Sequence, residues 1–84
     1  MQASAAGHHT GPLQVLLQGR GCGKFWVPVR DLRDASQQCR EFIEQNDVGS
    51  SCWYGGAVRD GERRLVATVA YNGRVFAPDG EVLP

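Results

Sequence analysis

The segment from Asp34 to Asn46 (DASQQCREFIEQN) constrains the fold most, because it is the one convincing helix in the chain. A lone helix of this length is marginal in water, so its apolar side must be buried against another element. Polar residues occupy its remaining faces. The apolar side chains recur at helical spacing and form a single stripe: Ala35, Cys39, Phe42 and Ile43.

The two ends of this helix carry capping signals. Asp34 is the expected N-cap, and Gln37 three residues later completes a pair that resembles a capping box. The helix should end near Asn46 and Asp47, with Gly49 as the left-handed residue that closes the last turn.

Two strands are expected before the helix, over residues 13–17 and 24–29, joined by a glycine-rich turn over 19–23. The alternation places Leu13, Val15 and Leu17 on one face of the first strand. In the second strand Phe25 shares the core face with Val27 and Val29, so Trp26 points outward beside Lys24. Pro28 cannot donate a ladder hydrogen bond, which favours an edge position for this strand.

A third strand is expected over residues 51–58, interrupted by Gly55 and Gly56. Two glycines within a strand indicate either a bulge or the close approach of another backbone. Trp53 and Tyr54 are adjacent, so one should pack inside while the other faces out or covers an edge. Asp60-Gly61 then signals a hairpin, which Glu62 could lengthen.

The strongest strand is expected over residues 64–71, and it should be central in the sheet. Asn72-Gly73 is typical of a type I′ turn and returns the chain into residues 74–77. Asp79-Gly80 turns the chain again, leaving residues 81–84 as a short strand or a tail. One face of the strongest strand carries Leu65, Ala67, Val69 and Tyr71.

This ββαβββ order predicts a single small α+β domain, with a mainly antiparallel, twisted sheet and one helix packed on one face. Eighty-four residues leave no room for a second core. Residues 1–11 are small and polar and are expected to form a flexible N-terminal arm, so the domain spans residues 12–84.

Composition excludes several functional classes. Nine basic residues balance nine acidic ones, so no overall field favours nucleic acid or an anionic membrane. The chain contains no apolar run long enough to span a membrane, and the N-terminus lacks the features of a secretory signal. Three cysteines, an odd number, fit a reducing, cytoplasmic compartment. Eight of the nine basic residues are arginine, which fits a GC-rich, bacterial-like genome as well as it fits function.

No residue pattern predicts catalysis, a metal or a cofactor. The loop from Gly19 to Lys24 lacks the following helix that a phosphate-binding loop needs. Cys22 lies between two basic residues, but the two histidines, His8 and His9, fall in the expected arm. The cysteines contain no CxxC pair, and the carboxylates fall on the helix surface and in turns. We therefore expect a protein that is not an enzyme.

The aromatic and basic residues are the informative ones. An exposed Trp or Tyr flanked by Arg is a common anchor at protein interfaces. The first hairpin supplies such a surface, so the sequence predicts an interaction module that binds a protein partner. The candidate partner-binding residues are Arg20, Lys24 and Trp26, with Tyr54 and Arg74 as secondary candidates.

Two alternatives remain open at this stage. Residues 19–40 carry a local excess of basic residues which, together with Trp26, resembles a nucleic-acid-binding surface. A dedicated nucleic-acid binder is usually basic overall, however, whereas this chain is neutral. A homodimer formed through an open sheet edge is the other alternative.

Overall fold

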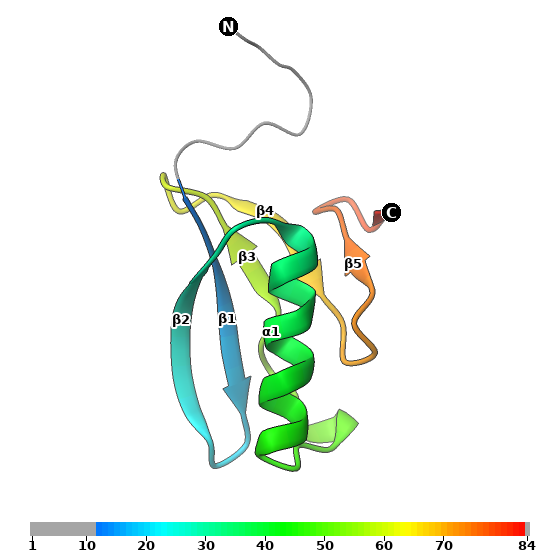
Figure 1. Ribbon diagram of the computed structural model, residues 1–84. Helices are drawn as coiled ribbons and strands as arrows, with labels where there is room; N and C mark the ends of the chain where they lie inside the picture. Colours follow the sequence, from blue (N-terminus) through cyan, green and yellow to red (C-terminus); the bar gives the residue numbers. More distant parts are fainter. Residues whose placement is uncertain (1–11, 84) are drawn as a thin grey trace, which may run out of the picture.

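The computed structural model describes residues 12–83, and these residues form one α-helix packed on one face of a six-stranded antiparallel sheet (Figure 1). The predicted α+β class and ββαβββ order are therefore confirmed, whereas the predicted arm lies outside the described residues. The strand order is β2-β1-β3-β4-β5-β6. The elements are β1 (Leu13–Gly19), β2 (Gly23–Val29), α1 (Leu32–Gln45), a 3₁₀ turn η1 (Ser50–Cys52), β3 (Ala57–Arg59), β4 (Leu65–Val69), β5 (Val75–Phe76) and β6 (Val82–Leu83).

Helix α1 begins three residues earlier than predicted, and Asp34 is not its N-cap. The cap is Asp31, whose carboxylate accepts the backbone N–H of Asp34 at 2.8 Å. The Asp34 carboxylate instead accepts the N–H of Arg30 at 3.0 Å. The predicted pairing of Gln37 with the cap is also wrong, because its amide donates to the carboxylate of Glu41. Since β2 runs to Val29, Asp31 is already in place to satisfy the first free amides of the helix.

The helix ends at the predicted C-cap Asn46, but Gly49 does not close it. Asp47 takes the left-handed conformation, with a φ of 53°. The N–H of Val48 then donates to the carbonyl of Ile43 at 2.9 Å, which is the bond expected of a Schellman motif. Asp tolerates this conformation better than most side chains, so glycine is not required at this position.

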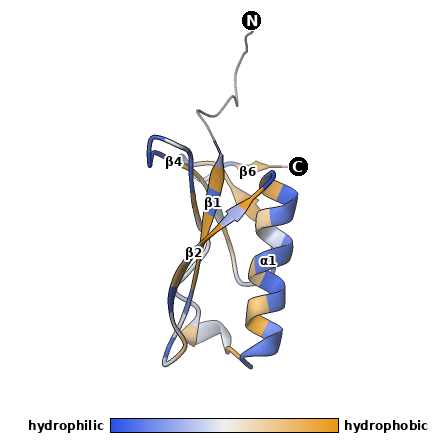
Figure 2. Ribbon diagram, turned by 60° about the vertical axis from the view of Figure 1, so that its left-hand side comes forward, coloured by the Kyte–Doolittle hydropathy of each residue, from blue (hydrophilic) through white to orange (hydrophobic). Residues whose placement is uncertain are grey.

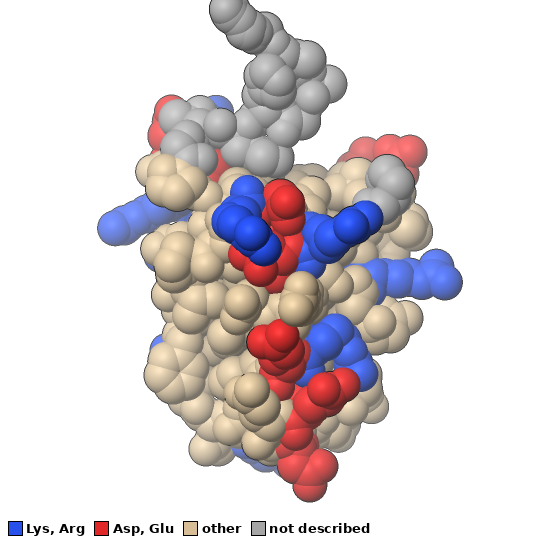
Figure 3. All heavy atoms as spheres, in the orientation of Figure 1, with Lys and Arg blue, Asp and Glu red and all other residues tan. Residues whose placement is uncertain are grey.

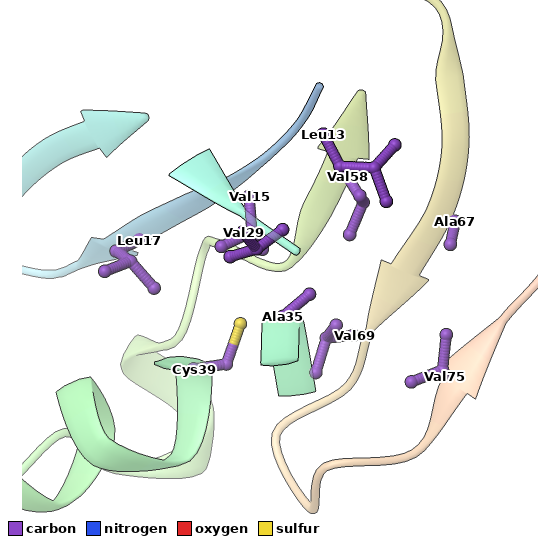
Figure 4. Packing of buried hydrophobic residues seen from close by; sticks show 10 residues of the cluster. All are labelled: Leu13, Val15, Leu17, Val29, Ala35, Cys39, Val58, Ala67, Val69 and Val75. Carbon is purple, nitrogen blue, oxygen red and sulfur yellow. The ribbon is translucent and has the colours of Figure 1, made fainter. Parts of the chain in front are cut away.

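The apolar stripe of α1 packs onto the inner face of the sheet, as predicted (Figures 2 and 4). Phe25 differs from the prediction: its side chain is 49% exposed and meets the ring of Phe42 at the margin of the core. Leu65 is 51% exposed, because a register shift after Val58 rotates the start of β4 out of line. The core consists of Leu13, Val15, Leu17, Val29, Ala35, Cys39, Val58, Ala67, Val69 and Val75.

The third strand is shorter than predicted, since residues 50–52 form η1 and only Ala57–Arg59 form β3. The residues between them nevertheless run alongside β1. The N–H of Tyr54 donates to the carbonyl of Gln18 at 3.0 Å, and the N–H of Gly56 donates to the carbonyl of Leu16 at 2.8 Å.

The glycine pair marks a close backbone approach, which confirms one of the two alternatives for this position. A Cβ on Gly55 would lie less than 3.0 Å from the carbonyl oxygen of Leu16. A Cβ on Gly56 would collide with the carbonyl oxygen of Val69, and Gly56 also has a φ of 105°. Only glycine allows β1 and β4 to lie this close to the intervening segment.

The turn at Asn72-Gly73 is not type I′, because only Gly73 has a positive φ. The N–H of Gly73 donates to the carbonyl of Ala70, and the N–H of Ala70 donates to the carbonyl of Arg74. This pattern is a three-residue loop in which a type I turn is followed by one left-handed residue. The loops that end in Arg63 and Gly80 have the same hydrogen-bond pattern and the same positive φ at the last position.

The glycine pair gives a stability prediction. Replacing Gly56 with alanine should cost more than about 3 kcal/mol of unfolding free energy in urea, because the new Cβ meets backbone that cannot move away. Gly21→Ala is the matched control: Gly21 also has a positive φ, but nothing lies within 4 Å of its new Cβ, so only about 1 kcal/mol should be lost. Equal losses in the two variants would contradict the close approach.

Candidate partner-binding surface

The single helix leaves one face of the sheet bare. Helix α1 covers the inner face, and no helix or strand of residues 12–83 lies over the other (Figure 2). We call this other side the open face. The strand register assigns the residues below to it; Leu16 is buried, and the others are half-buried or exposed. They are Gln14, Leu16, Gln18, Lys24, Trp26, Pro28, Ala57, Arg59, Thr68, Phe76 and Val82.

Charge is divided unevenly between the two layers. Within residues 12–83, all the acidic side chains lie in α1 or in turns and loops, and the strands contain neither Asp nor Glu. The charged strand residues are Lys24 and Arg59, which both belong to the open face. On the opposite side, acidic and basic side chains are interspersed over α1 (Figure 3). The open face is therefore locally cationic in a molecule of zero net charge.

Trp26 lies on the open face in the middle of the edge strand β2. It is directly opposite Leu16 in the β1–β2 register, and its ring is half-buried. The guanidinium carbon of Arg59 lies 3.7 Å from the ring centroid, which is a close cation–π contact. Arg59 is itself held by Gln14, whose side-chain oxygen accepts from Nε at 2.9 Å. These contacts fix the orientation of the indole before any partner arrives.

A second pair lies at the hairpin end of the open face. Arg20 Nε donates to the hydroxyl oxygen of Tyr54 at 3.2 Å, and this hydrogen bond raises the pKa of Arg20, which therefore stays cationic. Tyr54 is 49% exposed, whereas its neighbour Trp53 packs against Phe42 on the inner side. The expected division of these two adjacent aromatic residues is confirmed. Lys24 is paired with Gln18, the residue that also accepts the N–H of Tyr54.

The structure thus brings together four of the five predicted residues and separates the fifth. Arg20, Lys24, Trp26 and Tyr54 lie on or beside the open face, whereas Arg74 lines a pocket on the helix side. The sequence analysis missed Arg59, which covers the Trp26 ring. Its proximity depends on the register between β1 and β3, and residue spacing alone did not give that register.

The described residues contain no cluster of side chains suited to hold a metal ion. No group of three metal-ligating side chains occurs among residues 12–83, and His8 and His9 lie outside them. All three cysteines are free, with Cys22 and Cys52 half-buried. Burial raises the pKa of the Cys39 thiol to about 12, so this residue behaves as a small core side chain rather than as a nucleophile.

Comparison with known proteins gives no functional assignment: no family model, curated protein or solved structure matches this chain. Within residues 12–83 there is also no helix with the length and apolar character needed to cross a membrane. Surface chemistry and fold geometry are therefore the basis for any functional proposal.

Cys39 gives a pH-dependent stability prediction. Burial raises the pKa of its thiol from an ordinary value of 9.0 to about 12 in the folded state, so folding favours the neutral form. The stabilisation is fully present below pH 9 and should be lost as the pH rises from 9 towards 12. Urea unfolding across this range should show a steeper alkaline loss for the wild type than for Cys39→Ala. Identical slopes would contradict a buried, protonated thiol.

Proposed function

We propose that this protein is a small non-catalytic interaction module, and that its open face binds an acidic surface of a partner protein. The observation that carries the proposal is the exposed cationic and aromatic sheet face, whose strands contain no acidic residue. The three free cysteines further support placing the module in a reducing, cytoplasmic compartment.

The residue types on the open face are those that dominate protein interfaces. Trp, Tyr and Arg supply most strong contacts in such interfaces, particularly where the side chain is already held in place. Trp26 is held by Arg59, and Tyr54 is held by Arg20. A partner would therefore meet two ordered aromatic anchors with cations beside them, and a complementary partner surface would be acidic.

The exposed edge of β2 is a less suitable docking site than the face. The carbonyls of Leu16 and Gln18 accept hydrogen bonds on the β3 side of β1, so these residues do not bond β2. Their partners in the register, Trp26 and Lys24, therefore direct their backbone groups away from β1, towards the open edge. Pro28 lies at an equivalent position of β2. Proline offers no N–H, and an edge lysine opposes the addition of another strand. These features weigh against a homodimer formed through this edge and in favour of binding on the face.

Single-stranded nucleic acid is a second candidate ligand for the same surface. Trp26 and Tyr54 lie on an open antiparallel sheet beside Arg20 and Lys24, a combination that suits base stacking and phosphate contacts. Two observations weigh against nucleic acid as the main ligand. The chain has no net positive charge, and the Arg59 guanidinium already occupies one side of the Trp26 ring, where a base would stack.

A residue-resolved amide NMR titration tests the proposed function. The probes are a pool of Asp- and Glu-rich peptides and a pool of single-stranded oligonucleotides, each added at low salt. We expect the peptides to shift amides of β1, β2 and the segment around Tyr54. Trp26→Ala and Lys24→Glu should each weaken binding about tenfold or more while leaving the fold intact. Arg63→Glu, a charge reversal in the β3–β4 loop, is the matched control and should change binding little.

The salt dependence separates the two candidates. Nucleic-acid binding should fall steeply with added salt, because counterions are released on binding, whereas a protein interface of average polarity should respond much less. A response only to oligonucleotides would overturn the protein-partner proposal in favour of the second candidate. Peptide shifts confined to α1, or unfolding of Trp26→Ala, would show that the open face is not the binding surface.

A further inference from the structure

A separate pocket lies on the helix side of the molecule, away from the open face. It has a volume of about 250 Å³ and is bounded by the first turn of α1, the start of β5 and the end of β6. Its apolar walls are Leu32, Val75 and Leu83. Small-molecule pockets have volumes of roughly 300–1,000 Å³, so this pocket suits only a small organic ligand.

Two arginines line this pocket, Arg33 from α1 and Arg74 from the loop before β5. Neither guanidinium group has a hydrogen bond, ion pair or ring contact among residues 12–83, which sets both apart from those of most arginines in that range. Arg63 is the other arginine in this condition, and it lies in an exposed loop outside the pocket. The pocket therefore combines apolar walls with two guanidinium groups that have no anionic partner among the described residues.

The carboxylates at the N-terminus of α1 and the hydroxyl of Ser36 are already engaged. The Asp31 carboxylate caps the helix through the N–H of Asp34, and the Asp34 carboxylate accepts from Arg30. The Ser36 hydroxyl donates to the carbonyl of Gly73 at 2.7 Å. Hydrogen-bond donors for a ligand therefore come from the two guanidiniums, so a suitable ligand must carry acceptor atoms and negative charge.

We infer that this pocket binds a small monocarboxylate that carries a short branched apolar chain. Guanidinium groups bind carboxylates through paired, charge-assisted hydrogen bonds, and a branched aliphatic chain matches walls formed by leucine and valine. The site depends on neither Trp26 nor Lys24, so it stands apart from the proposed function. The sequence analysis grouped Arg74 with the partner-binding residues, and the pocket gives this arginine a different role.

The test uses isocaproate as the probe, with isocaproamide as its neutral isostere and acetate as the anion without the chain. In an amide NMR titration of the full chain, isocaproate should cause saturable shifts in residues 32–36 and 73–75. The dissociation constant should be on the order of 1 mM, in keeping with a ligand of this size. Isocaproamide and acetate should each bind at least about tenfold more weakly, because each lacks one of the two contacts.

Substitutions of Arg33 and Arg74 test whether these two arginines hold the carboxylate. Arg33→Gln and Arg74→Gln should each weaken isocaproate binding about fivefold or more, without changing the melting temperature by more than a degree or two. Arg63→Gln is the matched control, since it removes another exposed arginine that lies outside the pocket, and it should leave binding unchanged. The proposal would be overturned if isocaproate caused no saturable shifts, or if isocaproamide or acetate bound as tightly as isocaproate. It would also be overturned if Arg63→Gln weakened isocaproate binding as much as the two pocket variants do.

Discussion

The contact between α1 and β1 is the constraint on which the rest of the structure depends. Ala35 and Cys39, which are both fully buried, present short side chains to the sheet and let the helix lie close over Val15. Because the chain has one helix in its described part, this contact closes only the inner face of the sheet. The core is therefore one-sided, and the open face is a direct consequence of having a single covering element.

The open face combines side chains that would be unfavourable in a core. Arg59 lies over Trp26 and is anchored by Gln14, while Arg20 is joined to Tyr54 across the hairpin end. These contacts reduce the exposed aromatic area and also hold the rings in fixed orientations, which lowers the entropic cost of binding. The absence of acidic residues from the strands leaves the face with one sign of charge. Local order and local charge together distinguish this surface from an ordinary solvated sheet.

Local patterns predicted the fold well where one physical signal dominated. The apolar stripe of the helix, the edge position of Pro28 and the close approach at Gly55-Gly56 each follow from one strong constraint. The prediction failed where two residues could serve equally, as with Asp31 and Asp34 at the N-cap. It also failed for Arg59, because the β1–β3 register that places Arg59 opposite Gln14 arises from long-range pairing rather than from local sequence.

The most direct test of the central claim is a selection of random peptides displayed on phage against the wild-type protein. Enriched peptides are then tested against a Lys24→Glu, Trp26→Ala double variant and against a Glu41→Lys, Glu44→Lys variant of the exposed helix surface. The account predicts acidic peptides that bind the helix variant normally and lose binding to the open-face variant. The account would be contradicted by peptides that still bind the open-face variant but no longer bind the helix variant.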